Sequence, residues 1–213
     1  MITIYEYLLS KSKTSDSWKA TDENIHELVR EALDERGLDA DLNYIDVSAV
    51  TDMTDLFAAE MKTNSHKNAL GEEYADLNPD ISKWDVRNVK SFDHMFWMAD
   101  KFDCDLSSWN VSSAVTMNYM FCHAHSFNSD LSKWDVSNVA KMQGMFSNAY
   151  KFNSDISNWD VHNVTTMQFM FYEARSFNQD LRSWAPKRAC DGSSMFKNCP
   201  IEPKNHPHNI HYY

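Results

Sequence analysis

The chain has 213 residues, of which 43% are hydrophobic and 13% aromatic, and this apolar content is enough to bury a core and excludes an intrinsically disordered protein. The 31 acidic residues outnumber the 20 Lys and Arg residues, and the resulting formal net charge of -11 argues against direct binding of nucleic-acid phosphate. No apolar run reaches the roughly 18 residues that a membrane-spanning helix needs, so we expect one folded unit without a membrane span.

Residues 1–37 are predicted to form an N-terminal segment that ends in a capping helix. The first residues carry Glu6 within a short apolar stretch and show neither the basic region nor the cleavage site of a secretory signal. As the sequence stands, we therefore expect a cytoplasmic protein. Residues 21–37 have the amphipathic pattern of a helix, with acidic residues at the start and Gly37 at the end. We expect this helix to cover the first repeat.

A 25-residue repeat is predicted to occupy residues 38–199. Five tryptophans share the same spacing of 25 residues, which chance does not produce: Trp84, Trp109, Trp134, Trp159 and Trp184. A degenerate sixth copy lies at 46–57, with Ile45 in the Trp position. Since Ile45 and Trp84 are 39 residues apart, 14 more than one period, an insertion falls within 58–76.

The apolar positions of each copy predict one helix and one strand. Positions 8, 11, 12 and 15 after each Trp follow the spacing of a short helix that packs by one face. In the copy that begins at Trp159, these positions hold Met167, Met170, Phe171 and Ala174. Asn163, four residues after the same Trp, is predicted to be the N-cap. The segment before each Trp, such as 152–159, is flanked by turn residues and is predicted to be a short strand.

These elements predict an α/β solenoid, a right-handed superhelix of about six copies with one short parallel strand and one short helix per 25-residue repeat. Residues 200–213, rich in Pro and His, are predicted to be a C-terminal tail that closes the far end. The four cysteines form neither a CxxC pair nor a disulfide framework, so we expect free thiols. A disulfide between Cys190 and Cys199 is the alternative if the protein is exported.

The repeat motif resembles that of a known family. The copies at Trp134 and Trp159 read Trp-Asp-Val-x-Asn-Val-x-x-Met-x-x-Met-Phe and are followed by Phe-Asn-x-Asp-Leu/Ile. Over about residues 38–199 the chain resembles the BspA-like leucine-rich-repeat family, in the 25-residue variant common in bacterial surface proteins and lipoproteins. The resemblance implies a leucine-rich-repeat-like solenoid for adhesion and protein recognition, with a place at the cell surface and no catalytic motif.

The repeated carboxylates have two explanations. An Asp stands four residues before each Trp, at Asp80, Asp105, Asp130, Asp155 and Asp180. Stacked carboxylates can bind calcium, but Asp and Asn ladders also bind the turn backbone, and we favour this structural role. The nine histidines lack the spacing of a metal site, so no metal is predicted. No sequence motif of a hydrolase, metalloprotease or nucleotide-binding enzyme is present, so we expect no enzyme and no cofactor.

Two sets of exposed residues are candidates for partner binding. The outward positions of the predicted helix, 10 and 13 after Trp, carry large aromatic side chains at Trp97, Tyr119, Phe169 and Tyr172. The alternative, that the insertion or the tail folds back and covers these side chains, is equally open. The second set lies on the predicted strand face and comprises Lys83, Lys133, Asn158 and Arg182.

The function that these features predict is a non-enzymatic protein-binding module, adhesin-like or for partner recognition. The alternative is an intracellular inhibitor, of phage or mobile-element origin, whose acidic surface blocks a host nucleic-acid-binding enzyme. In both cases the partner is a protein, and the sequence determines neither its identity nor the oligomeric state.

Overall fold

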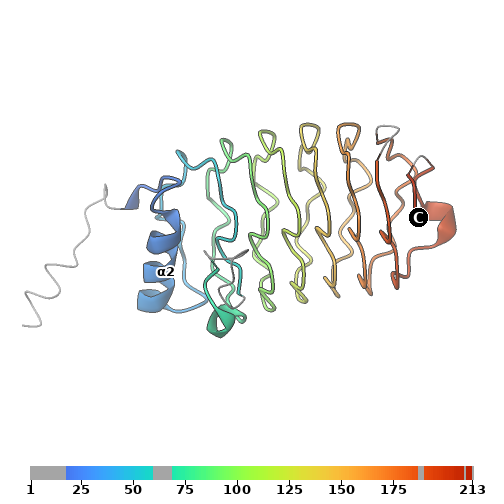
Figure 1. Cartoon of the computed structure of the whole chain (residues 1–213). Helices are drawn as coiled ribbons and strands as arrows, with labels where there is room; N and C mark the ends of the chain where they lie inside the picture. The colour runs from blue at the N-terminus through green and yellow to red at the C-terminus, as the bar shows by residue number, and fades with distance from the viewer. Residues whose placement is uncertain (1–17, 60–68, 187–189, 209, 213) are drawn as a thin grey trace, which may run out of the picture.

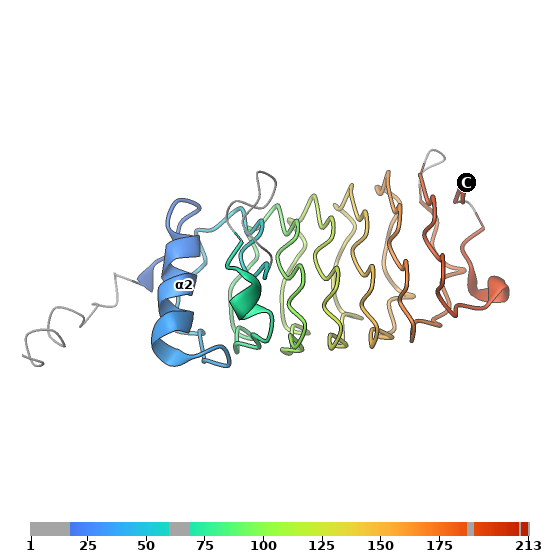
Figure 2. The ribbon, with the colours of Figure 1, turned by 60° about the horizontal axis from the view of Figure 1, so that its bottom comes forward.

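The computed structural model describes residues 18–59, 69–186, 190–208 and 210–212. In this part of the chain, successive coils lie side by side in one row, as the views in Figures 1 and 2 show. The start of the chain and residues 60–68 of the predicted insertion fall outside the described residues. Within the described ranges, no helix is long and apolar enough to cross a membrane.

One α-helix lies at the N-terminal end of the row, where residues 21–37 predict a helix (Figure 1). This helix, α2, spans Ile25–Arg36, and Gly37 follows it with a φ of 94°. It begins at Ile25 rather than Thr21 because the Thr21 N–H donates to Asn24 Oδ1 at 2.7 Å and forms a turn. Its apolar side chains, Ile25 and Leu28 among them, are buried in the same core as the first coils. Two short 3-10 helices, η2 (Glu72–Tyr74) and η3 (Pro203–Asn205), are the other named elements of the described residues.

The predicted α/β solenoid, with a strand and a helix in every copy, is wrong. The coils contain neither an α-helix nor a named strand among the described residues, and isolated parallel bridges join single residues of neighbouring coils. One row of these bridges keeps the 25-residue spacing through Ser91, Thr116, Lys141 and Thr166. The segment 152–159, predicted to be a strand, turns before its Trp, where the Trp159 N–H donates to the Ile156 carbonyl at 3.1 Å.

Tandem turns replace the predicted helix. In the copy that begins at Trp84, the Met95 N–H donates to the Phe92 carbonyl and the Trp97 N–H to the His94 carbonyl, each three residues back. Positive φ angles near 60° recur 10 and 14 residues after Trp, as at His94 and Met98, and an α-helix cannot contain them. Consecutive turns of this kind bring the same positions to one side as a helix would, and therefore mimic its apolar stripe.

Backbone N–H groups that would bond within a helix pass instead to the next coil. At each of the five junctions between coils, the N–H groups 8, 10, 12 and 14 residues after Trp donate to carbonyls of the following coil at 2.7–3.0 Å. At the junction after Trp84, the donors are Phe92, His94, Phe96 and Met98. The predicted N-cap role of Asn163 is also wrong, since its side-chain amide donates to the Ser137 carbonyl of the preceding coil.

The core is a set of side-chain columns that run along the row. Each described Trp of the repeat is 2–4% exposed, and its indole N–H donates to a carbonyl of the preceding coil, as Trp134 does to Leu106 at 3.0 Å. Met167, Met170, Phe171 and Ala174 are all 0% exposed. The burial of these positions, predicted from their spacing, is confirmed.

Candidate interaction surface

The repeated carboxylates bind the turn backbone. Asp105 and Asp130 each accept the N–H of the serine two residues later at 2.9 Å, and these bonds hold the pKa of both carboxyls below its usual value. The residue two before each Asp of this column forms a second ladder, in which Asn128 accepts the Asn153 N–H of the next coil at 2.7 Å. In both columns, the side-chain oxygens therefore accept specific backbone N–H groups, which supports their structural role. Among the described residues, no three potential ligands gather as a metal site would require.

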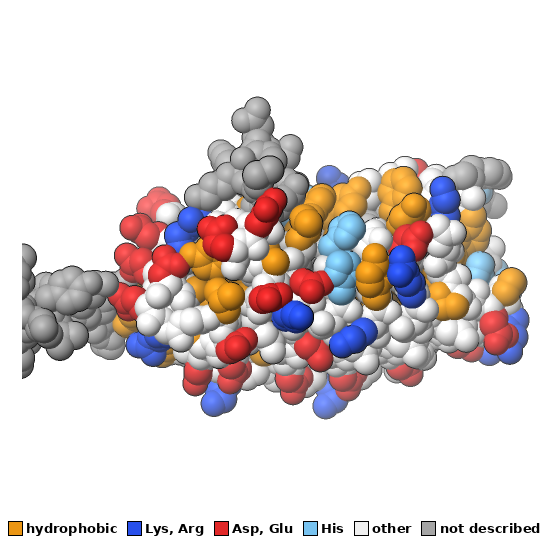
Figure 3. All heavy atoms as spheres, turned by 90° about the horizontal axis from the view of Figure 1, so that it is seen from below, with side chains coloured by type: hydrophobic (Ala, Val, Ile, Leu, Met, Phe, Trp, Pro, Cys, Tyr) orange, Lys and Arg blue, Asp and Glu red, His pale blue; other side chains and the backbone are white. Residues whose placement is uncertain are grey.

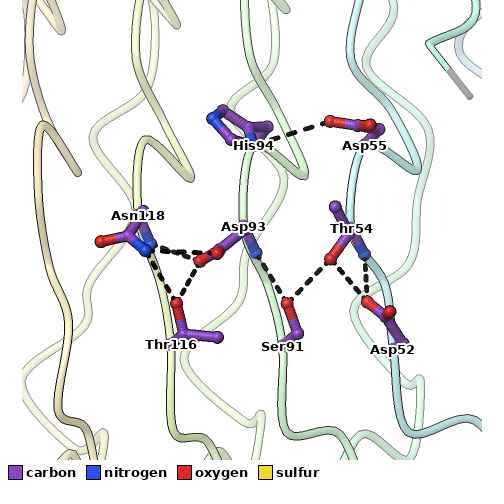
Figure 4. A network of polar contacts seen from close by, with 8 residues as sticks. All are labelled: Asp52, Thr54, Asp55, Ser91, Asp93, His94, Thr116 and Asn118. Carbon is purple, nitrogen blue, oxygen red and sulfur yellow. Dashed lines mark hydrogen bonds and ion pairs between the residues drawn. The ribbon is translucent and has the colours of Figure 1, made fainter. Parts of the chain in front are cut away.

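A third polar ladder, which the sequence did not single out, lies at the first coils (Figure 4). The Asp93 carboxylate accepts the backbone N–H of Asn118 in the next coil at 2.7 Å, and the Asn118 amide donates to its other oxygen at 3.2 Å. On the other side, the Ser91 hydroxyl accepts the Asp93 N–H and shares a 2.8 Å hydrogen bond with the Thr54 hydroxyl. These polar groups bind one another across three coils, so this ladder is structural.

The predicted aromatic residues form two pairs on one edge of the row. The rings of Trp97 and Tyr119 lie 5.4 Å apart, and Tyr119 also stacks on His94 at 5.4 Å with an interplanar angle of 7°. The Tyr119 ring lies over Gly144, where a Cβ would approach its Cε1 atom to 2.2 Å. Gly144 therefore provides the space in which this ring lies flat along the edge.

The second pair is more exposed. The Phe169 and Tyr172 rings meet edge to face at 6.1 Å, and Phe169 is 38% exposed. Met98, at 37%, adds a second exposed apolar side chain. We name Trp97, Met98, Tyr119, Phe169 and Tyr172 the aromatic edge. In Figure 3, hydrophobic and histidine side chains gather in a band along one face of the row, with mixed charges beside it.

A further cluster of charged and aromatic side chains, which the sequence analysis did not predict, surrounds Tyr150. The Tyr150 ring stacks on His125 with ring centres 4.3 Å apart. The Arg175 guanidinium lies 4.2 Å from the centre of the same Tyr150 ring. The Asp100 carboxylate is hydrogen-bonded to His125. Burial, and then the charge of His125, lower the pKa of His123. Asp100, His125, Tyr150 and Arg175 share position 16 after Trp, just beyond the predicted helix, and this shared position was the signal for them.

The described residues of the tail do not cover the second pair. They pack at the end of the row, where the Tyr212 and His206 rings lie 5.7 and 4.5 Å from the Phe196 ring. Phe169 keeps its exposure in the presence of this tail. Residues 60–68 of the other covering segment, the insertion within 58–76, lie outside the described residues, so covering by the insertion stays a prediction.

The second candidate set is divided between distant coils. Lys83 and Lys133 are exposed on coils that are two repeats apart, whereas Asn158 and Arg182 line one open hollow of about 550 Å³. Ser157, Asp180, Ser183 and His208 complete its lining. Three hydrogen bonds join the Arg182 guanidinium to the Asp180 carboxylate at 2.6–3.0 Å, and they lower the pKa of that carboxyl to about 2. Because the Arg182 charge is neutralised inside the hollow, this set is the weaker candidate.

The sequence matches the family described as "Mycoplasma protein of unknown function, DUF285" over residues 10–125 and again over 109–208. No curated protein and no solved structure matches the chain. The resemblance to the BspA-like leucine-rich-repeat family is therefore wrong, because the matching family is a different one. The leucine-rich-repeat solenoid that this resemblance implied is also wrong, because the described coils contain no repeated strands and helices.

Proposed function

Because this chain belongs to the Mycoplasma family DUF285, whose function is unknown, we propose from its surface that it is a non-enzymatic protein-binding module whose partner contacts the aromatic edge. We propose a protein partner rather than a nucleic acid, since the net charge of -11 repels phosphate.

One observation carries this proposal: an exposed Phe at a position where the fold favours glycine. Phe169 has a φ of 57° and is 38% exposed. Left-handed backbone costs a residue other than glycine roughly 1–2 kcal/mol. The same column holds Gly144, with a φ of 59°, in the preceding coil and Ser194 in the following one. The fold therefore does not need a large ring at this position, and a contact with a partner explains why one is there.

The surroundings of the edge suit a protein interface. Exposed aromatic side chains are common energetic centres of such interfaces, and a polar rim surrounds them. Here Arg175 with Tyr150, and His125 with Asp100, provide polar groups beside the apolar side chains. Lys197 lies 5.8 Å from the Tyr172 ring centre and extends this rim toward the end of the row.

Photo-crosslinking tests the proposal. A benzoylphenylalanine at position 169 should give a defined crosslinked product in cells of the source organism, and one at Val115 should not. Val115 is the matched control because it is 46% exposed but lies in another column. Purified unlabelled chain should compete for the crosslink, and a Phe169→Gly chain should not. Since glycine suits the φ of 57°, this variant should remain folded.

Competition by Phe169→Gly as strong as that by the unchanged chain would refute the aromatic edge as the binding site. A captured enzyme with a basic groove, in a complex that dissociates steeply with rising salt, would favour the inhibitor alternative instead.

A further inference from the structure

The last coil has a row of backbone donors to which no described residue provides an acceptor. In every earlier coil, four N–H groups after the Trp position donate to the next coil. In the last coil, only the first of these four does so, from Gly192 to the His211 carbonyl at 2.9 Å. The N–H groups of Ser194, Phe196 and Asn198 have no acceptor among the residues that the structure describes.

This edge has the same conformation as the paired edges inside the row. Ser194 and Asn198 have φ values of 55° and 59°, and the equivalent residues one coil earlier, Phe169 and Glu173, have 57° and 56°. Those two residues donate to the last coil at 3.0 Å. The four hydrogen bonds from these positions run in one direction at every junction, so the peptide groups that make them are aligned and present their N–H groups at the last coil.

The described residues of the tail cover side chains of this coil, and none of them provides a carbonyl for the three donors. The tail pairs with the coil at two places, where the Leu181 N–H donates to Asn205 and the Gly192 N–H to His211. Beyond them, the described tail contributes the Tyr212 ring, which lies 5.7 Å from the Phe196 ring. The open feature is therefore a backbone edge and not an apolar groove.

A second copy of the chain does not fit this edge. Two copies that meet by their last coils would bring donors against donors. The matching carbonyls, those of Thr54, Leu56 and Ala58 in the first coil, lie at the other end of the row, where α2 is packed (Figures 1 and 2), and the Ala58 carbonyl already accepts the Leu70 N–H. The Asp22 side chain just before α2 also bonds to the Thr51 and Asp52 N–H groups there and holds α2 in place.

We propose that this edge binds an extended segment of another protein, which runs parallel to the last coil and lends its backbone carbonyls to the Ser194, Phe196 and Asn198 N–H groups. The binding is of the strand-addition type, in which main-chain bonds supply most of the affinity and the side chains of the segment matter less. This surface is separate from the aromatic edge, and each can fail without the other.

Hydrogen exchange measured by NMR on the unmodified chain is the first test. The three edge amides should exchange about 100-fold faster than those of Phe169 and Phe171, which are bonded within the row. The probe is a synthetic peptide with the sequence of residues 164–174, because this segment already presents its carbonyls to a neighbouring coil. Saturating peptide should slow the edge amides about tenfold or more. If the peptide does not slow their exchange, the proposal is overturned.

A backbone variant identifies the bond. Cys190 allows native ligation of a synthetic 190–213 segment to the rest of the chain, so a single N-methyl group can be placed on Phe196. This change removes one unpaired donor and should weaken peptide binding about tenfold, with an unchanged unfolding midpoint. N-methylation of Met195 is the control: its N–H donates to the Gly192 carbonyl at 2.9 Å, so the unfolding midpoint should fall.

Two further results would overturn the proposal. One is peptide binding that N-methylation of Phe196 leaves unchanged. The other is slowed exchange at the edge that grows with the concentration of the chain alone, because it would assign the edge to self-association.

Discussion

Replacing Trp134 by Phe should lower the free energy of unfolding by about 2–3 kcal/mol. The indole is 3% exposed and lies between Trp109 and Trp159, with ring centres 6.5 and 6.4 Å away. Its N–H donates to the Leu106 carbonyl at 3.0 Å. That carbonyl also accepts the Trp109 N–H at 3.1 Å, so it stays bonded in the variant and the hydrogen bond accounts for only about 1 kcal/mol. The space left by the smaller ring adds roughly 1–2 kcal/mol.

Urea denaturation, followed by circular dichroism, measures this difference. Phe146→Leu is the control: Phe146 is equally buried and stacks on Phe152 at 3.8 Å, and its loss should cost about 1 kcal/mol because only packing is lost. If Trp134→Phe costs no more than Phe146→Leu, the indole bond between coils does not stabilise the row and our reasoning fails.

Three other changes test neighbouring features. Gly144→Ala should destabilise the chain by about 1–3 kcal/mol in the same denaturation assay, since its φ is 59° and its Cβ would collide with Tyr119; adding Tyr119→Ala should recover part of the loss. Hydrogen bonds lower the pKa of Asp130 below 3.8 in the folded chain, so its stabilising effect is present above about pH 4 and is lost as the pH falls below it. Asp130→Asn should therefore reduce the slope of stability against pH in acid titrations. Burial raises the pKa of the Cys190 thiol to about 11, so alkylation at pH 8, followed by mass spectrometry, should modify it only after unfolding.

The periodicity of the sequence predicts what is buried better than it predicts how the backbone runs. A spacing of 8, 11, 12 and 15 after Trp is shared by a helix and by consecutive turns, so Met167 and Phe171 are buried in either case. Consecutive turns differ from a helix in the positive φ angles at positions 10 and 14 after Trp. Gly144 and Asn148 stand in these columns and are residue types that adopt such angles, and they were the signal for turns. Phe169 in the same column hides that signal, because a bulky residue seldom adopts a positive φ.

Candidate surface residues follow the same division. The outward positions 10 and 13 after Trp identified Trp97, Tyr119, Phe169 and Tyr172. The structure places them in two pairs, one across neighbouring coils (Trp97 and Tyr119) and one within a coil (Phe169 and Tyr172). The contacts of Tyr150 with His125 and Arg175 could not be predicted from a helix in each copy, since such a helix ends before position 16. The open backbone edge has no sequence signal at all, because any residue except proline provides an N–H group.

The two ends of the row are chemically unlike, and this follows from the tandem turns. Each coil donates the four N–H groups at positions 8, 10, 12 and 14 to the following coil, so the matching carbonyls stand at the first coil and the matching donors at the last. At the first coil, α2 covers the core with apolar side chains such as Leu28 and Val29. At the last coil, the core is likewise covered, by Tyr212 and His206. The two requirements, a covered core and a paired backbone, are thus met separately. At the last coil the core is covered, but the Ser194, Phe196 and Asn198 N–H groups have no acceptor within the described chain.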